Sequence, residues 1–143
     1  YRIVSGNTGT GVYKYDGPYD CFIDIKKVKE LYQISIKPSE TIEIGAQCTL
    51  KTLIDSINSN LASQPGFEYL NEIGLHLSKI ANKSVRNMAT WAGNLAIKKA
   101  HLEFPSDVFL CFETIDAKIN LISKGADDPI RGTKKKNLIN LIL

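Results

Sequence analysis

The sequence predicts an α+β domain with a small mixed or antiparallel sheet flanked by helices, and three patterns support this fold class. Residues 32–46 (YQISIKPSETIEIGA) alternate apolar and polar side chains on either side of a Pro-Ser-Glu turn, as an antiparallel hairpin does. Residues 49–80 carry two apolar stripes at helical spacing. No regular strand–helix–strand repeat is present, so a regular parallel α/β fold is not indicated.

The first elements are predicted to be short. Residues 21–25 (CFIDI) are typical of a mostly buried strand, and residues 26–31 of a helical turn in which Val28 and Leu31 share one face. In the hairpin that follows, the isoleucines alternate with polar residues and residues 38–40 form the turn. One face of this hairpin is therefore expected to be buried and the other wet.

Two amphipathic helices are predicted next, separated by a loop at residues 64–66. Thr49 is a good N-cap for the first helix, and Gly74 in the second permits close approach to a neighbour. The stripe of the first helix consists of Leu50, Leu53, Ile54, Ile57 and Leu61. The stripe of the second consists of Leu70, Ile73, Leu77 and Ile80. Both stripes are expected to face the core.

The second half predicts two more helices and a strand. Residues 84–96 (SVRNMATWAGNLA) follow no strong period, whereas a Pro-Ser-Asp signal at residues 105–107 supplies candidate caps for a helix. Residues 117–123 (AKINLIS) alternate as a half-buried strand does, and residues 125–132 predict a loop. Residues 135–143 (KKNLINLIL) are expected to start a last helix.

The composition is that of one globular domain. The 143 residues are 43% hydrophobic and 23% charged, with a formal net charge of +3, and no apolar run reaches the roughly 20 residues of a membrane-spanning helix. The basic run at residues 134–136 is more typical of a solvated surface than of a nucleic-acid-binding stripe. Cys21, Cys48 and Cys111 form no CxxC pair, which favours a reducing, cytoplasmic location without disulfides or a metal site. We therefore expect no nucleic-acid and no membrane partner, and we expect from the start at Tyr1 that the chain is part of a longer protein.

Two stretches rich in small residues mark the candidate site, SGNTGTGVYK (residues 5–14) and MATWAGN (residues 88–94). The first has two interpretations: its glycines serve a turn, or the N–H groups of residues 6–10 converge on an oxyanion such as a phosphate. It matches neither GxGxxG nor GxxxxGK(S/T). Both stretches together could close on a diphosphate, whose oxygens accept N–H and hydroxyl hydrogen bonds where larger side chains would block approach.

No catalytic group of residues is indicated. The sequence suggests neither a Ser/His/Asp set nor a Cys/His pair, and His76 and His101 have no second metal ligand at a suitable spacing. If the chain takes part in catalysis, a cofactor is expected to carry the chemistry.

The order of these segments resembles the FAD-binding domain, of the PCMH type, in the aldehyde oxidase and xanthine dehydrogenase family of molybdo-flavoenzymes. The resemblance covers nearly the whole chain and rests on the GNT loop, the IGA-x-x-TL step at residues 44–50 and the VRNMAT-x-AGN segment at residues 85–94, in this order. The long connection LAIKKAHLEFPSD (residues 95–107) is more similar to that of insect aldehyde oxidases than to that of xanthine dehydrogenases.

The resemblance implies that residues 1–143 are a partial FAD-binding domain, the second subdomain of that fold. Residues 4–14 would hold the FAD diphosphate and residues 88–94 would form a second FAD loop. The implied FAD contacts are Val4, Ser5, Gly6, Asn7, Thr8, Gly9, Thr10, Gly11, Ile80, Ala89, Thr90, Gly93, Asn94 and Asp107. Trp91 fits beside a phosphate loop only if its side chain points away, and valine at Gly6 or Gly93 is expected to push a branch into the phosphate path.

The resemblance further implies an oxidoreductase that passes electrons from a molybdenum cofactor through 2Fe–2S clusters to FAD and then to dioxygen. The iron–sulfur and molybdenum domains would lie elsewhere in the enzyme, which is expected to be a cytoplasmic homodimer when full length. The alternative is a non-catalytic domain that keeps the fold, has lost FAD and serves as an interaction or structural module.

Overall fold

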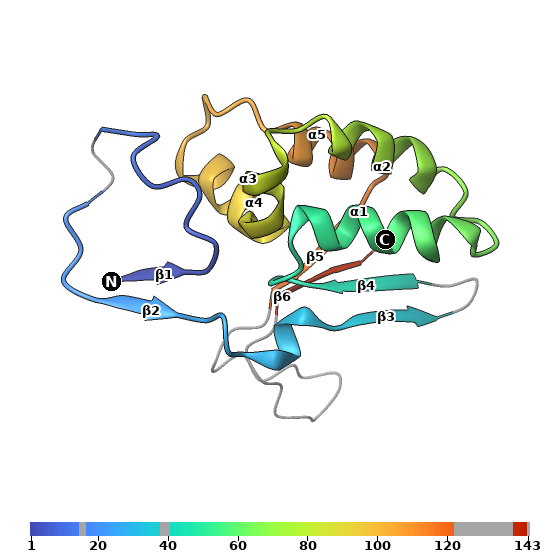
Figure 1. Ribbon diagram of the computed structural model, residues 1–143, viewed down its shortest axis with the longest axis horizontal. Helices are drawn as coiled ribbons and strands as arrows, with labels where there is room; N and C mark the ends of the chain where they lie inside the picture. The colour runs from blue at the N-terminus through green and yellow to red at the C-terminus, as the bar shows by residue number, and fades with distance from the viewer. Residues whose placement is uncertain (15–16, 38–40, 122–138, 143) are drawn as a thin grey trace.

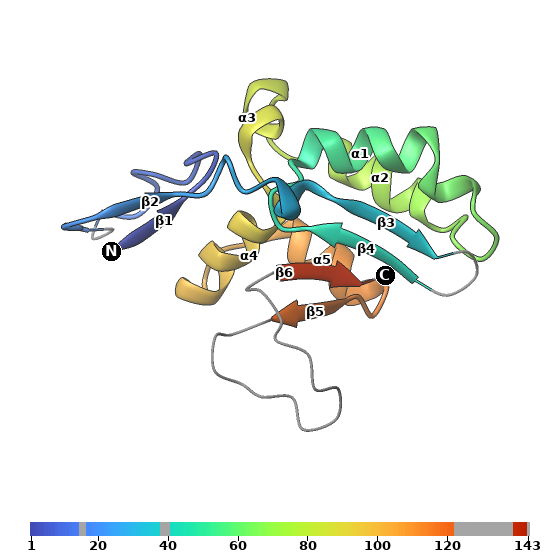
Figure 2. The ribbon, with the colours of Figure 1, turned by 90° about the horizontal axis from the view of Figure 1, so that it is seen from below.

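The computed structural model describes residues 1–14, 17–37, 41–121 and 139–142 (Figure 1). Helices cover one face of a four-stranded sheet, and a two-stranded ribbon stands to one side (Figures 1 and 2). In chain order the elements are β1 (Arg2–Val4), β2 (Phe22–Asp24), the 3-10 helix η1 (Lys29–Tyr32), β3 (Ile34–Lys37), β4 (Thr41–Gly45), α1 (Leu50–Ser59), the 3-10 helix η2 (Leu61–Ser63), α2 (Leu70–Ser78), α3 (Lys83–Met88), α4 (Trp91–Ala100), α5 (Asp107–Thr114), β5 (Lys118–Leu121) and β6 (Ile139–Ile142). This arrangement confirms the predicted α+β class.

The predicted hairpin forms from β3 and β4. The strands pair antiparallel, with Ile34 opposite Ile44 and Ile36 opposite Ile42. Ile42 and Ile44 are fully buried beneath the helices, so one face of the hairpin is dry, as predicted. The predicted turn at residues 38–40 lies outside the described residues.

The helices α1 and α5 were predictable from local start signals, and α1 and α2 from their apolar stripes. Thr49 caps α1 by accepting the N–H of Thr52, and Ser106 caps α5 by accepting the N–H of Phe109. Gly74 of α2 lies against α1, since an added Cβ would be 3.0 Å from Ile57. Helix α1 ends earlier than its stripe, and the last stripe residue, Leu61, is buried from η2 instead.

Residues 84–96, where no period was visible, form most of two helices. Asn82 caps α3 by accepting the N–H of Val85, and Thr90 caps α4 by accepting the N–H of Gly93. Within α4 only Trp91 is fully buried, so the helix buries too narrow a face to leave a stripe in the sequence.

The prediction of a last helix is wrong for residues 139–142, which form strand β6. It pairs antiparallel with both β4 and β5, with Leu141 opposite Ile44 and Ile119. A strand here satisfies backbone hydrogen bonds of two neighbours at once, which outweighs local helix preference. The rest of the predicted helix, the basic run at 134–136 and the predicted loop at 125–132 lie outside the described residues.

The predicted strand at residues 21–25 forms as β2, but the prediction that it is mostly buried is wrong. It pairs parallel with β1 only, and the side chains of Phe22 and Ile23 are 61% and 44% exposed. A two-stranded ribbon has no second layer to cover it unless another segment packs on it.

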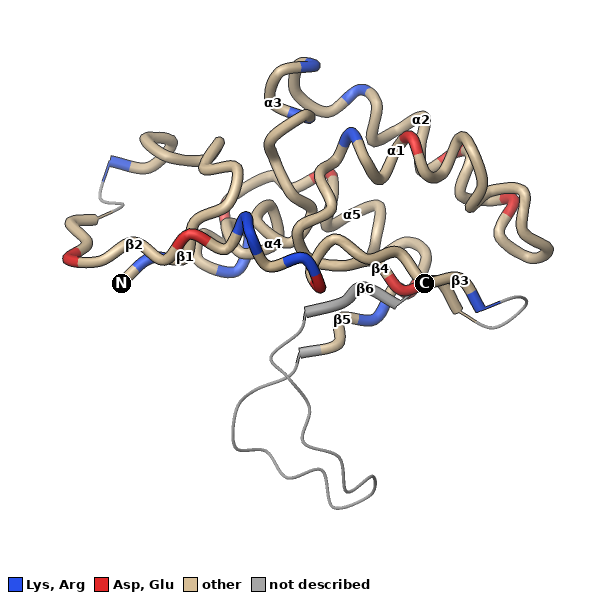
Figure 3. The backbone as a smooth tube through the Cα atoms, turned by 60° about the horizontal axis from the view of Figure 1, so that its bottom comes forward, with Lys and Arg blue, Asp and Glu red and all other residues tan. Residues whose placement is uncertain are grey.

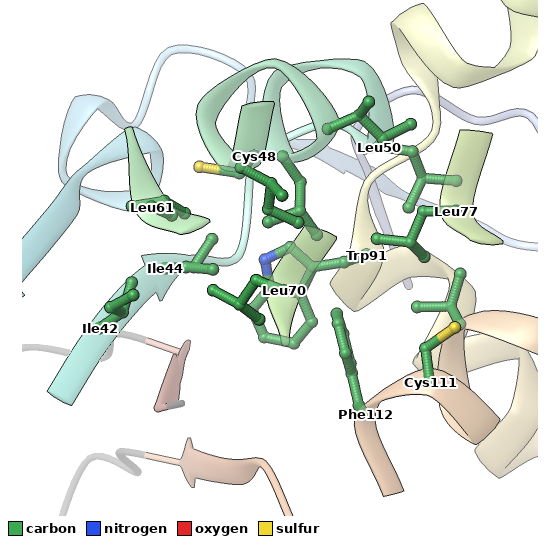
Figure 4. Packing of buried hydrophobic residues seen from close by; sticks show 14 of the residues in the cluster. Ile42, Ile44, Cys48, Leu50, Leu61, Leu70, Leu77, Trp91, Cys111 and Phe112 are labelled. Atoms are coloured by element: carbon green, nitrogen blue, oxygen red, sulfur yellow. The ribbon is translucent and has the colours of Figure 1, made fainter. Parts of the chain in front are cut away.

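The core lies between the sheet and the helices (Figure 4). Its largest fully buried side chain is Trp91, which makes an edge-on contact with Phe112 at 6.0 Å between ring centroids.

Cys48 and Cys111 are buried free thiols and Cys21 is an exposed one. Among the described residues, none of the helices is long and apolar enough to cross a membrane. Charges of both signs are spread along the chain, including residues 24–30 (Figure 3).

Candidate functional site

The glycine-rich loop leaves β1 with several backbone N–H groups open. Asn7 and Gly11 adopt left-handed conformations, with φ of 53° and 82°. The N–H of Thr10 bonds to the carbonyl of Asn7 at 3.4 Å, and the Thr10 hydroxyl donates to the Asn7 side chain at 2.6 Å. No acceptor among the described residues takes the N–H groups of residues 6–9, so these donors remain available to a ligand.

The loop lies along α4 and touches it at three levels. An added Cβ on Gly6 would lie 1.8 Å from the Met88 carbonyl oxygen, just before α4. An added Cβ on Gly9 would lie 2.5 Å from the end of the Ile97 side chain, in the middle of that helix. Farther along, the Tyr13 ring stacks on His101 at 3.5 Å and 3°, at the end of the helix. The two predicted loops therefore meet in space.

The contacts at Gly6 and Gly93 change the reason why these positions are small. The missing Cβ of Gly6 makes room for the protein's own backbone at Met88. A Cβ on Gly93 would lie 2.9 Å from the hydroxyl oxygen of Thr90, the group that caps α4. A side chain at either position would thus disturb protein contacts first, before it could reach a bound phosphate.

The second predicted loop is the start of helix α4. Thr90 is buried and its hydroxyl caps the helix. The backbone carbonyl of Ala89 accepts the N–H of Leu50 at 2.8 Å. Trp91 points into the core, where its indole N–H donates to the carbonyl of Gly45 at 2.8 Å (Figure 4). The sequence predicts that Trp91 fits beside a phosphate loop only if its ring points away from the loop, and the ring does lie in the core (Figure 4).

The starts of α4 and α5 are joined by a hydrogen bond between side chains. The Ser106 hydroxyl donates to the Asn94 carboxamide at 2.6 Å while its oxygen also accepts the N–H of Phe109. Asp107 follows as the first residue of α5 and is exposed. The starts of α4 and α5 thus lie together, and each helix N-terminus is favourable to an anion.

Ile80 is held differently from the other predicted contacts. It follows α2, is half-buried against the core, and accepts a hydrogen bond from Arg86 at 2.7 Å through its carbonyl. The structure therefore groups the loop with α4 and the start of α4 with that of α5, and attaches Ile80 to α3.

Two polar residues of this region were missed in the sequence. Gln47 is buried and accepts a hydrogen bond from the Ser5 hydroxyl, which ties the start of the loop to the segment before α1. Ser106 was predicted as a cap but not as the partner of Asn94. A polar residue in the apolar stretch at 42–50 was the only available signal for Gln47.

The titratable groups near the loop do not form a catalytic pair. Burial and the Glu103 carboxylate raise the pKa of Tyr13, and the Nδ1 of His101 lies 3.5 Å from that carboxylate. The backbone N–H of Lys26 lowers the pKa of Asp24, followed by the charges of Lys26 and Lys27. None of these groups is aligned with a nucleophile among the described residues, and no cluster there could hold a metal ion.

Fold and site together define an α+β domain with a small-residue loop and two helix starts suited to an anionic ligand. Residues 1–131 match the family model of the FAD binding domain in molybdopterin dehydrogenase, and the chain belongs to this family. The predicted family is confirmed.

Similar proteins include plant aldehyde oxidases. Aldehyde oxidase 4 of Arabidopsis thaliana is 35% identical over 130 residues, which are 91% of this chain and 9% of that protein. Abscisic-aldehyde oxidase of the same plant is 35% identical over 122 residues, 85% of this chain and 9% of its own length. The chain therefore spans about a tenth of these relatives. Similarity to insect aldehyde oxidases in particular stays a prediction.

A solved structure with the same fold is quinoline 2-oxidoreductase from Pseudomonas putida 86. It superposes with a TM-score of 0.68 at 20% identity and covers 99% of this chain and 50% of that chain. This likeness supports the fold only. The α+β prediction agrees with it.

Proposed function

We propose that this chain forms part of the FAD-binding domain of an aldehyde oxidase-like oxidoreductase. The observation that carries the proposal is the contact of Gly6 with the backbone at Met88, which brings the loop with its open N–H groups at residues 6–9 alongside α4, beginning at the start of that helix. Backbone donors beside helix N-termini fit a diphosphate, because they supply hydrogen bonds and partial positive charge.

Within this proposal the residues divide into three groups. Residues 4–14 hold the diphosphate, through Val4, Ser5, Gly6, Asn7, Thr8, Gly9, Thr10 and Gly11. The start of α4, in residues 88–94, holds the phosphates and the ribityl chain through Ala89, Thr90, Gly93 and Asn94. Asp107 contacts the cofactor from the start of α5, and Ile80 packs against it.

The electron route of the full-length enzyme is also a proposal. When bound, FAD supplies a carrier that receives electrons from iron–sulfur clusters and delivers them to dioxygen. This chain spans only a small share of its relatives' length. We propose that the iron–sulfur and molybdenum domains lie in other parts of the full-length protein. We propose a cytoplasmic homodimer for the whole enzyme, with an aldehyde as substrate.

Flavin retention tests the proposal. The full-length protein is purified, desalted, and read for visible absorbance and flavin fluorescence. We expect a bound flavin spectrum. We expect Asn94→Leu to lower the flavin content, because it removes a proposed FAD contact and the hydrogen bond that Ser106 donates to Asn94. The matched control is Asn71→Leu, a change on the exposed side of α2. A colourless, folded protein that does not quench added FAD would instead favour the interaction module that has lost FAD.

A further inference from the structure

A polar groove lies between the segment after β2, the start of α1 and the end of α3. Its volume is about 340 Å³, and it is lined by Ser5, Gly6, Lys26, Tyr32, Gln47, Thr49, Asn87 and Met88. Ser5 and Gly6 are proposed FAD contacts and Met88 begins the second FAD loop, whereas the other lining residues lie outside the proposed FAD site. The volume is at the lower end of the range for small-molecule sites.

The base of this groove holds a buried amide with an unused donor. Gln47 is 1% exposed, and its backbone N–H is fixed by the carbonyl of Leu31 at 2.8 Å. Its side-chain oxygen accepts the Ser5 hydroxyl, whereas its side-chain nitrogen is buried and has no hydrogen-bond partner among the described residues. Buried donors without a partner are rare in folded proteins, so this nitrogen calls for an acceptor from outside the described residues.

The charge of the groove favours an anionic acceptor. Lys26 is the one charged residue of its lining, and its ion pair with Asp24 is long, at 3.6 Å, and exposed. Such a pair is weak enough for the ammonium group to turn toward a ligand. Thr49 places the N-terminus of α1, ten residues long, at the same groove, which adds partial positive charge.

Beside the polar Asn87, the groove also has apolar walls. The Tyr32 ring and the Met88 side chain are 43% and 53% exposed and line the groove. Both offer surface to a hydrocarbon or aromatic body. An inorganic anion would leave this surface uncovered, whereas an organic acid would cover it.

We propose that this groove is a binding site for a small organic carboxylate. The Gln47 amide nitrogen donates to one carboxylate oxygen and the Lys26 ammonium group balances its charge. Tyr32 and Met88 cover the apolar body of the molecule. Lys26 and Gln47 lie outside the proposed flavin contacts, while Ser5, which donates to the Gln47 side-chain oxygen, is one of those contacts and joins the two sites.

Calorimetric titration of the full-length protein with benzoate tests this site, with benzamide as an uncharged molecule of the same shape. We expect saturable benzoate binding that weakens by about tenfold or more in Gln47→Leu, because a hydrogen bond to a charged group is lost. Lys26→Met should weaken benzoate binding as well, and benzamide should bind the wild type more weakly than benzoate does. The matched control is Lys27→Met, which removes a neighbouring exposed lysine that does not line the groove.

Comparison among variants separates this groove from benzoate sites elsewhere in the protein, because heat from other sites is common to all samples. The absence of saturable benzoate binding would overturn the proposal, as would equal affinities in the wild type and Lys26→Met. If Gln47→Leu does not fold, the exposed Lys26→Met variant and benzamide decide the question. Flavin absorbance of each sample shows separately whether the FAD site is intact, so failure of one proposal does not imply failure of the other.

Discussion

Gly6→Ala is the sharpest test of how the glycine loop is placed. The φ angle of Gly6 is not positive, so the change introduces no left-handed strain; only the contact matters. The new Cβ would lie 1.8 Å from the Met88 carbonyl oxygen and 2.5 Å from its carbon, whereas real Cβ contacts stay above 3.0 Å. The loop and the start of α4 must therefore separate by more than about 1 Å. Loss of one hydrogen bond from the displaced loop to the charged diphosphate costs about 1.5–3 kcal/mol, or roughly tenfold to 100-fold in FAD affinity.

The assay is titration of FAD into the deflavinated full-length protein, followed by quenching of flavin fluorescence. The control is Gly66→Ala, at a glycine between η2 and α2 whose φ is 85° and which has nothing within 4 Å of an added Cβ. It strains the backbone by about 1 kcal/mol without touching the loop, so FAD affinity should not change. Wild-type affinity in Gly6→Ala, with an unchanged structure, would refute the contact as the determinant of the site.

Three further outcomes are expected in urea unfolding of the isolated chain, followed by circular dichroism. Thr90→Val should cost about 1 kcal/mol because it removes the cap of α4, and Thr90→Ser should retain most of that stability; equal losses would argue against the cap. Trp91→Phe should cost about 2 kcal/mol through a cavity and the lost hydrogen bond to Gly45, and a neutral change would contradict its anchoring role. Burial raises the pKa of Cys48 to about 11 from 9.0, so the unfolded chain loses its thiol proton first and stability should fall as pH rises from about 9 to about 11. Cys48→Ala should make this fall smaller, and the remainder reflects Cys111, whose pKa is raised by burial and by Asp107. A thiol reagent should label the exposed Cys21 in the folded chain but Cys48 only after unfolding.

Elements with local signals were predictable from the sequence. The isoleucine alternation fixes the register of β3 and β4, because a shift by one residue would turn Ile42 and Ile44 to the wet face. Thr49 and Ser106 marked two helix starts correctly. In each case the chemistry that stabilises the element lies within a few residues of it.

Elements fixed by distant partners were not predictable in the same way. The apolar end INLI suits a helix or a strand, and only the space between β4 and β5 decides for β6. Exposure of Phe22 depends on which layer covers the ribbon, which its own residues do not specify. The helix α4 was hidden because small residues follow its cap and a single large side chain, Trp91, is buried.

The candidate site shows the same division. The residue types of the two loops suggested an anion, and the resemblance supplied the cofactor. The contact of Gly6 with Met88 and the hydrogen bond from Ser106 to Asn94 join residues far apart in the chain or across a loop. These partners could not be read from residue types, since glycine and serine are equally typical of ordinary turns.

Neighbouring residues fix the start of α4 in two ways, and this explains how a site of small residues can be rigid. Thr90 caps the helix, while Trp91 enters the core and donates to Gly45. Gly45 is itself in close contact, since an added Cβ would lie 2.1 Å from the Leu31 carbonyl oxygen. The helix start is thus held by the core of the sheet, and the loop is held by the helix start. A loss of core packing at Trp91 should therefore loosen the proposed phosphate site even though the ring itself points away from it.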